Sequence, residues 1–200
     1  MKLVFATNNL HKIKEIQSLL HNSFQILSLA DIGFTGEIPE DCSTLEGNAS
    51  QKAWFIYQRY GFNSFADDTG LEVEALDGEP GVLSARYAGA GKNFDDNITK
   101  LLDVMSEINN RNARFRTVIS LVIDQQEMQF EGIVRGGILR ERRGHQGFGY
   151  DPVFRPEGSD LTFAEMDLEE KNKISHRGRA FHQMVSYLLG NPGFKAVMKA

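Results

Sequence analysis

The sequence predicts an α/β protein with a mixed sheet, and two observations carry this prediction. Short apolar runs alternate with segments of helical spacing in the first half of the chain, as in βα units, whose strands run parallel. The second half contains two β-rich runs, 115–123 and 128–139, around a short polar stretch, which is typical of a hairpin. Because hairpin strands are antiparallel, the sheet should contain both strand directions.

The first half is expected to contain four short strands and two helices. A strand at 2–6 precedes a helix at 10–20, where Ile13, Ile16, Leu19 and Leu20 recur at helical spacing, and a strand at 24–29 follows. A loop at 30–43 leads to a helix with Ala49, Ala53, Trp54 and Tyr57, which Gly61 ends. Two short strands, 65–66 and 71–75, are expected on either side of the polar turn Asp67-Asp68-Thr69-Gly70.

The second half is expected to be richer in ordered loops. A glycine-rich loop at 78–91 precedes an amphipathic helix at 94–105 and then the hairpin. A second glycine-rich loop at 144–156, a polar segment and a last helix near 178–189 complete the chain. We find no repeat and no clear linker, so we expect one domain over residues 1–200.

Composition excludes several classes of partner. The 200 residues are 41% hydrophobic and 24% charged, which suits a globular domain with a core. The formal net charge is −5 without an extended basic stripe, so we expect no nucleic-acid partner. No apolar run is long enough to span a bilayer or form a signal peptide, so we expect no membrane association. The single cysteine, Cys42, excludes an internal disulfide and suits the cytoplasm.

The first candidate site lies where a strand passes into a helix, at Thr7-Asn8-Asn9-Leu10-His11-Lys12. Free backbone N–H groups and the helix dipole at such a junction attract anions. Lys12 would lie one turn into the helix, within reach of a phosphate. The alternative is an ordinary N-cap followed by a solvated lysine.

The second candidate site is the acidic pair Asp67-Asp68, followed by Thr69 and Gly70. Adjacent carboxylates at a strand end suit Mg²⁺, which prefers oxygen ligands and keeps several waters. One carboxylate could hold the metal while the other orients or deprotonates a water. The alternative is an acidic turn before a strand.

Two later segments offer groups for a nucleobase. Gly147-Phe148-Gly149-Tyr150-Asp151 combines close backbone approach with aromatic faces, although a tight turn with buried rings would look the same. Lys171, His176 and Arg177 supply donors and positive charge, although a solvated helix face is the alternative. Taken together, the four segments indicate a nucleotide site with phosphoryl chemistry.

In this order, the segments resemble the Ham1/inosine-triphosphatase family. The resemblance covers residues 6 to about 180 and is highly specific. Its motifs are 6–9 with Lys12, then 66–73, 81–89, 147–152, 162–166 and 171–178.

The resemblance implies a fold, a reaction and an assembly. The fold would be an elongated mixed sheet, ITPase-like as in Maf and Ham1 proteins, with two lobes flanking a nucleotide cleft. The reaction would be Mg²⁺-dependent hydrolysis of inosine, deoxyinosine and xanthosine triphosphates to monophosphate and pyrophosphate. The assembly would be a homodimer.

The resemblance also implies roles for individual residues. Thr7, Asn8, Asn9, Leu10, His11 and Lys12 would bind phosphate, Asp68 would be general base and metal ligand, and Thr69 would contact substrate. Phe148, Gly149, Tyr150 and Asp151 would hold base and sugar, and Lys171, His176 and Arg177 would complete the pocket. Adenine would be rejected if donors from Arg177, His176 or loop amides faced the purine O6 position, since its amino group would leave them unpaired.

One position departs from the family pattern. The family carries a glutamate where this chain has Gly47, with Glu46 one residue earlier. We expect Thr44 to cap the helix, and we expect Gly47 to let its first turn unwind so that Glu46 joins Asp67 and Asp68 at the metal. Water in the metal shell is the alternative. Competing functions are a Maf-like pyrophosphatase with other substrates and a non-catalytic nucleotide sensor.

Overall fold

The computed structural model describes residues 1–19 and 24–190. Its helices and strands follow in chain order: β1 (Lys2–Phe5), α1 (Leu10–Leu19), β2 (Gln25–Leu27), α2 (Leu45–Tyr60), β3 (Ser64–Val73), β4 (Pro80–Gly81), α3 (Phe94–Val104), β5 (Asn112–Ile123), β6 (Gln126–Ile138), β7 (Phe154–Pro156), α4 (Leu168–Ile174) and α5 (His176–Gly190). Leu20, where the predicted first helix ends, lies outside the described residues. Among the helices that the structure describes, none has the length and apolar character needed to cross a bilayer.

Within the described residues, seven strands form one mixed sheet, as predicted. The strand order is β2-β1-β3-β5-β6-β7, and β4 pairs with β3. β1 runs parallel to β2 and β3, whereas β3–β4 and β6–β7 are antiparallel. The predicted hairpin is β5 and β6, joined by Asp124 and Gln125, whose positive φ values are those of a tight two-residue turn. The mixed α/β class is therefore confirmed.

The chain forms two compact units whose segments alternate along the sequence. The first unit contains Met1–Asp68, Thr117–Gly132 and the chain from Arg177 onward, and the second contains Thr69–Arg116 and Ile133–His176. The long strands β3, β5 and β6 therefore contribute residues to both units.

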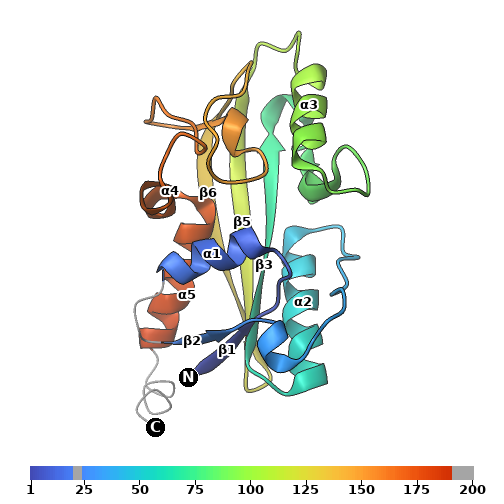
Figure 1. Cartoon of the computed structure of the whole chain (residues 1–200), viewed down its shortest axis with the longest axis vertical. Helices are drawn as coiled ribbons and strands as arrows, with labels where there is room; N and C mark the ends of the chain where they lie inside the picture. The colour runs from blue at the N-terminus through green and yellow to red at the C-terminus, as the bar shows by residue number, and fades with distance from the viewer. Residues whose placement is uncertain (20–23, 191–200) are drawn as a thin grey trace. The chain divides into compact units, whose positions relative to one another are not determined.

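In the first unit, helices cover both faces of the strands (Figure 1). One face packs against α1 and α5 through a core that includes Phe5, Ile16, Phe65, Leu121 and Phe181. The other packs against α2 through Val4, Ala53, Ile56, Ala66 and Val122. Successive strand residues alternate between these two cores, since Phe65 belongs to one and Ala66 to the other.

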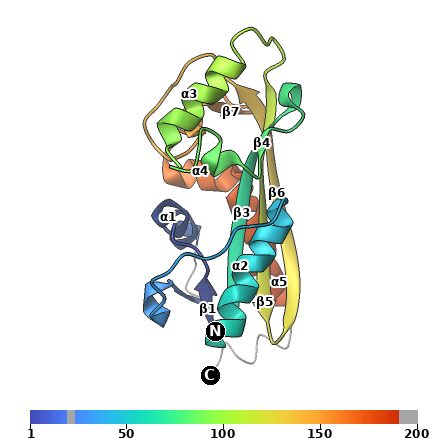
Figure 2. The same cartoon turned by 90° about the vertical axis from the view of Figure 1, so that its right-hand side faces the viewer.

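In the second unit, α3 and α4 lie on the same side of the strands (Figure 2). They enclose a core in which Phe115 packs against Phe154 and Phe163, with ring centroids 4.7 and 6.1 Å apart. This core supports the loop that precedes β7, because Tyr150 and Val153 are buried within it.

Two expectations for local structure were wrong. The polar turn predicted at Asp67–Gly70 is part of a continuous ten-residue strand, β3, because the acidic side chains find partners on its two faces. Gly70 fits there because a Cβ atom would lie 2.6 Å from the backbone oxygen of Gly81 on β4. The polar segment before the last helix was not expected to be helical, but it contains α4. This helix begins with a capping box between Asp167 and Glu170.

Candidate active site

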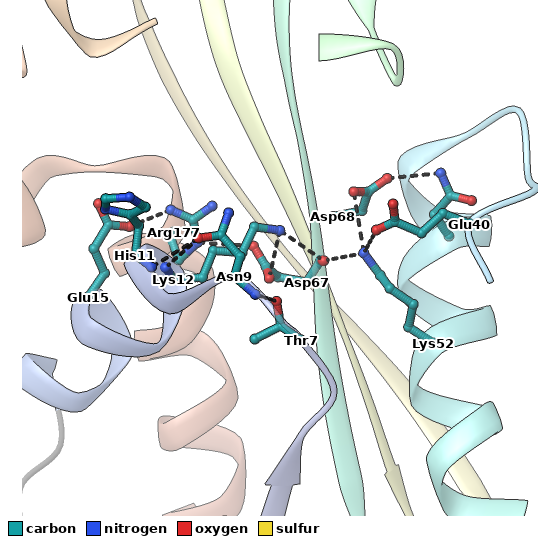
Figure 3. A network of polar contacts seen from close by, with 11 residues as sticks. Thr7, Asn9, His11, Lys12, Glu15, Glu40, Lys52, Asp67, Asp68 and Arg177 are labelled. Carbon is teal, nitrogen blue, oxygen red and sulfur yellow. Dashed lines mark hydrogen bonds and ion pairs between the residues drawn. The ribbon is translucent and has the colours of Figure 1, made fainter. Parts of the chain in front are cut away.

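The two acidic residues of β3 point to opposite faces of the strand (Figure 3). Asp67 faces α1 and α5, where it contacts Lys12 and Arg177. Asp68 faces α2, where it contacts Asn48 and Lys52. This follows from strand geometry, since consecutive side chains alternate in direction. The two carboxylates therefore lie in different surroundings and do not act as one paired ligand.

Asp67 lies at the centre of a buried charge network. Its Oδ1 lies 3.0 Å from Lys12 Nζ, and its Oδ2 accepts a hydrogen bond of 3.0 Å from Arg177 Nε. Arg177 is 2% exposed and also donates through Nη1 to the buried Glu15 of α1. Burial acts to raise the pKa of Asp67, but the charges of Lys12, Arg177 and Lys52 hold it well below its usual range.

Arg177 was expected to face the purine base, and this role stays a prediction, because the structure shows Arg177 in contact with two carboxylates. Its guanidinium is enclosed and bound to the carboxylates of Asp67 and Glu15, so it fixes α5 to α1 and β3. A planar guanidinium suits this task because its fork binds two carboxylates at once.

The junction at the start of α1 is ordered by its own side chains. Asn9 Oδ1 accepts from the backbone N–H groups of His11 and Lys12, at 2.9 and 3.3 Å, as an N-cap does. Thr7 Oγ1 accepts from Asn9 N at 3.1 Å, and Asn8 Nδ2 donates to the backbone oxygen of Gly36 at 3.1 Å. The cap expected as an alternative is therefore present, and phosphate binding by Thr7–Lys12 stays a prediction.

Lys12 differs from the solvated lysine of that alternative. Its side chain is 13% exposed and lies beside Asp67. Burial lowers the pKa of Lys12, and the neighbouring cations Lys52 and Arg177 act in the same direction, while Asp67 opposes them. The amine is held next to β3, 3.0 Å from Asp67 Oδ1.

Asp68 has more access to solvent than Asp67 and shares a lysine with a second acid. Its Oδ2 accepts from Asn48 Nδ2 at 3.1 Å, and its Oδ1 lies 3.5 Å from Lys52 Nζ. Lys52 Nζ also contacts Glu40 Oε1 at 2.7 Å and the backbone oxygen of Asp67 at 2.8 Å. Although burial opposes it, the negative charges of Asp68 and Glu40 raise the pKa of Lys52, which stays an ammonium ion.

Sequence reasoning had not singled out Glu15, Glu40, Asn48 or Lys52 as members of this site. Asn48 and Lys52 lie four residues apart on α2, so both face Asp68, and this spacing was a usable signal. Nothing in the sequence distinguished Glu40 from the other acids of its loop. Glu15 is a buried carboxylate on an amphipathic helix, and only the fold shows that it meets Arg177.

The start of α2 is a regular first turn. Thr44 is the N-cap, as expected, and its Oγ1 accepts from Gly47 N at 3.0 Å. The helix begins at Leu45, so the unwinding that was expected to turn Glu46 inward does not occur. Packing explains why position 47 is a glycine, because a Cβ atom there would lie 2.7 Å from Cys42 Cβ.

The expected three-carboxylate metal site of Glu46, Asp67 and Asp68 is corrected accordingly. Among residues 1–19 and 24–190, no group of three or more His, Cys, Asp or Glu side chains gathers in a way that could hold a metal ion. Asp67 is occupied by Lys12 and Arg177, which leaves Asp68 as the carboxylate of this pair that is open to a ligand.

In the second unit, the structure brings Phe148, Asp151 and Lys171 together. Asp151 Oδ2 accepts from Lys171 Nζ at 2.6 Å and from Phe148 N at 2.8 Å. Lys171 Nζ also lies 5.2 Å from the centroid of the Phe148 ring. Gly147 allows the loop to close, because a Cβ atom there would lie 2.0 Å from Asp151 Oδ2.

The other residues expected to hold base and sugar have different surroundings. Tyr150 is buried and donates to the backbone oxygen of Ser84 at 3.0 Å, and burial raises its pKa. His176 is buried and stacks on Phe115, with ring centroids 4.5 Å apart. Phe148, Gly149 and Thr69 are half-buried. Phe148 therefore presents the accessible aromatic ring of its loop, whereas Tyr150 supports that loop from inside.

Known proteins resemble this chain along nearly all of its length. The dITP/XTP pyrophosphatase of Flavobacterium psychrophilum is 54% identical over 187 residues, which cover 94% of this chain and 98% of that protein. The dITP/XTP pyrophosphatase of Flavobacterium johnsoniae is 55% identical over 188 residues, with the same coverage. Among solved structures, a HAM1 protein from Coxiella burnetii matches with a TM-score of 0.88 and 36% identity, covering 96% of this chain and 100% of that one.

A family model agrees with these similarities. The model of the Ham1 family matches residues 3–187, which include every strand and helix described above except the first residue of β1 and the last turn of α5. The chain therefore belongs to the Ham1 family.

Proposed function

We propose that this protein hydrolyses inosine, deoxyinosine and xanthosine triphosphates between the α- and β-phosphates, releasing pyrophosphate and the monophosphate. The observation that carries the proposal is Asp68, a carboxylate with access to solvent that lies beside the ammonium of Lys52. The names of the relatives that are 54 and 55% identical, dITP/XTP pyrophosphatase, support the same reaction and substrates.

The cations around Asp67, in the middle of β3, suit a triphosphate. Lys12 Nζ and Lys52 Nζ approach the backbone oxygen of Asp67 from two sides, at 3.4 and 2.8 Å. A triphosphate carries about four negative charges, and attack on phosphorus requires that these charges be neutralised. We assign this role to Lys12 and Lys52, with the Thr7–Lys12 junction orienting the phosphates.

Asp68 is the proposed general base. Its carboxylate would accept a proton from the attacking water as the water adds to the α-phosphorus and pyrophosphate leaves. Asn48 Nδ2 holds one carboxylate oxygen at 3.1 Å, which fixes the orientation of the group toward the water. Lys52 Nζ lies 3.5 Å from the other carboxylate oxygen, on the side of α2.

The carboxylates of Asp68 and Glu40 fit a magnesium ion. Both contact the ammonium of Lys52, so their oxygens already converge on one cation, at 3.5 and 2.7 Å. Magnesium commonly takes one or two protein carboxylates together with waters and substrate phosphates. A bound Mg²⁺ would neutralise phosphate charge and stabilise the leaving pyrophosphate. This pair replaces the expected set that included Glu46 and Asp67.

For the base, we propose contact with Phe148 and selection through its loop. The ring of Phe148 is half-buried, so one part of it can stack on a purine. Donors in this loop or on His176 would face O6 of hypoxanthine or xanthine. Adenine carries an amino group there and would leave such a donor unpaired, which costs about 1–3 kcal/mol.

Pyrophosphate release from a panel of nucleoside triphosphates, with and without Mg²⁺, tests the proposal. We expect ITP, dITP and XTP to be cleaved to monophosphate and pyrophosphate, with ATP much slower and with little turnover without Mg²⁺. Release of orthophosphate, or equal rates on ATP and ITP, would refute it. Preference for UTP or dUTP would indicate a Maf-like activity, and binding without turnover would indicate a nucleotide sensor.

We also propose that the protein works as a homodimer in the cytoplasm. The similarity to the Ham1 family and the single cysteine support this. Light scattering of the purified protein tests the assembly, and a monomeric mass at micromolar concentration would contradict it.

A further inference from the structure

Glu127 lies at the start of β6 and accepts hydrogen bonds from four side chains. Trp54 Nε1 and Ser50 Oγ, both on α2, donate to its Oε2 at 2.7 and 3.0 Å. Ser120 Oγ on β5 and Gln129 Nε2 on β6 donate to its Oε1 at 2.8 and 3.0 Å. An ionised carboxylate has about four lone-pair sites, so this group is saturated.

These four donors are all neutral. Burial acts to raise the pKa of Glu127, but the hydrogen bonds from Trp54, Gln129, Ser120 and Ser50 lower it, so the carboxylate stays ionised. Bonds to an ionised acceptor are stronger than bonds between neutral groups, so the link between β6 and α2 is firm.

Helical geometry relates this link to Asp68. One residue of helix is about 100° of rotation, so Asn48 and Lys52 share one side of α2, while Ser50 and Trp54 share a side about 200° away. The face between them packs on the sheet through the buried Ala49, Ala53 and Ile56. The helix therefore contacts β3 through one flank and β6 through the other.

The packed face of α2 combines small and large side chains. Ala49 and Ala53 present single methyl groups to the sheet, Ile56 is buried beside them, and Phe55, Tyr57 and Tyr60 pack against the same core. Apolar packing of this kind is not directional. The two flanks carry the directional contacts. Asn48 and Lys52 reach Asp68 on one flank, and Ser50 and Trp54 reach Glu127 on the other.

We propose that Glu127 is a positioning residue for the reaction at Asp68. By holding Ser50 and Trp54, it sets the rotation of α2, which places Asn48 Nδ2 and Lys52 Nζ against the carboxylate of Asp68. Glu127 acts through the helix and touches neither substrate nor metal. This inference rests on the proposed role of Asp68 in hydrolysis.

The test compares variants that remove different hydrogen bonds from the same carboxylate. Glu127→Gln replaces an acceptor with an NH₂ group, and Trp54→Phe combined with Ser50→Ala removes both donors of α2. Ser120→Ala is the matched control, because it removes a bond to Glu127 from β5 and leaves both bonds to α2. Steady-state kcat and KM on XTP are measured together with hydrogen exchange of the peptide covering Leu45–Tyr60.

We expect Glu127→Gln and the double variant to lower kcat about tenfold, since small misplacements of reacting groups reduce turnover strongly. KM should change little, and amide exchange in α2 should become faster. Ser120→Ala should keep both kcat and the exchange of α2. In Glu127→Gln and Ser120→Ala, which keep Trp54, the only tryptophan, its fluorescence reports whether its indole has left residue 127.

Three results would overturn the inference. These are unchanged kcat in the double variant although α2 exchanges faster, unchanged exchange of α2 in the double variant, or an equal loss of kcat in Ser120→Ala. The proposed function fails separately, if the parent protein releases no pyrophosphate from any triphosphate. In that case the exchange measurements still decide whether Glu127 holds α2.

Discussion

Asp67 and Asp68 are consecutive residues of β3, yet their carboxylates contact different cations on different helices. Asp67 contacts Lys12 of α1 and Arg177 of α5, whereas Asp68 contacts Lys52 of α2. The side chain of Asp67 is fully buried and that of Asp68 is 13% exposed. Neutralising Asp68 should therefore affect turnover, whereas neutralising Asp67 should affect the stability of the fold.

Asp68→Asn should keep the fold and lower turnover. The amide keeps the shape of the carboxylate but cannot accept a proton from water, so we expect kcat on XTP to fall at least about a hundredfold. Asp67→Asn should instead lower the free energy of unfolding, because it leaves Lys12 and Arg177 buried with less negative charge nearby. Kinetics and urea unfolding of both variants check this. A Asp68→Asn variant with half of the parent activity would contradict the assigned base.

Arg177→Ala should destabilise the protein. The substitution leaves the buried carboxylates of Asp67 and Glu15 without their shared partner, and breaking such pairs costs about 3–5 kcal/mol. Arg179→Ala, an exposed arginine on the same helix, is the control and should change stability little. Urea unfolding measures both. A stable Arg177→Ala variant that had lost only its preference for ITP over ATP would restore the base-reading role.

Glu40→Gln should raise the magnesium concentration needed for half-maximal activity, because it removes one of the two carboxylates that converge on Lys52. Glu46→Gln should leave the magnesium curve close to that of the parent, since the first turn of α2 is not unwound. Titration of activity with Mg²⁺ in the three proteins separates these roles. If Glu46→Gln raised the magnesium requirement and Glu40→Gln did not, Glu46 rather than Glu40 would be the metal ligand.

Stability should fall in acid partly through Asp67. Its pKa is lower in the folded protein than in the unfolded chain, so between these two values only the unfolded chain binds the proton. Lowering the pH through this range therefore favours unfolding, by up to about 1.4 kcal/mol per pH unit for one group. Urea unfolding between about pH 6 and pH 3 should show a steeper loss in the parent than in Asp67→Asn. Equal slopes would contradict this contribution.

Features fixed by neighbours in the sequence were predicted well. Gly61 ends α2 with a positive φ, Thr44 caps it, and the hairpin of β5 and β6 turns where polar residues interrupt two β-rich runs. The strand β3 was predicted wrongly, because its run of polar residues is typical of a turn and the distant side chains that bind them cannot be found from neighbouring residues. Asp67 alone depends on residues 55 and 110 positions away, Lys12 and Arg177.

Some residues of the site could likewise be predicted from the sequence, and others could not. Residue type pointed to Asp68 and Lys12, but the ion pairs of Arg177 with Asp67 and Glu15 depend on the packing of α1, α5 and β3, which no local pattern reveals. Glu40 and Lys52 were missed because an acid and a lysine acquire a role only when the fold brings them to the same carboxylate.

The contact between Gly47 and Cys42 limits the order in which substitutions can accumulate during evolution. A side chain at position 47 would press on Cys42 Cβ, and the backbone N–H of Cys42 donates to Asn48 Oδ1 at 2.9 Å. Asn48 in turn holds Asp68. A side chain that arose at position 47 would therefore disturb the placement of Asp68, the proposed general base, unless the chain around position 42 had already moved away. The two positions should covary among descendants, with changes at 42 arising first.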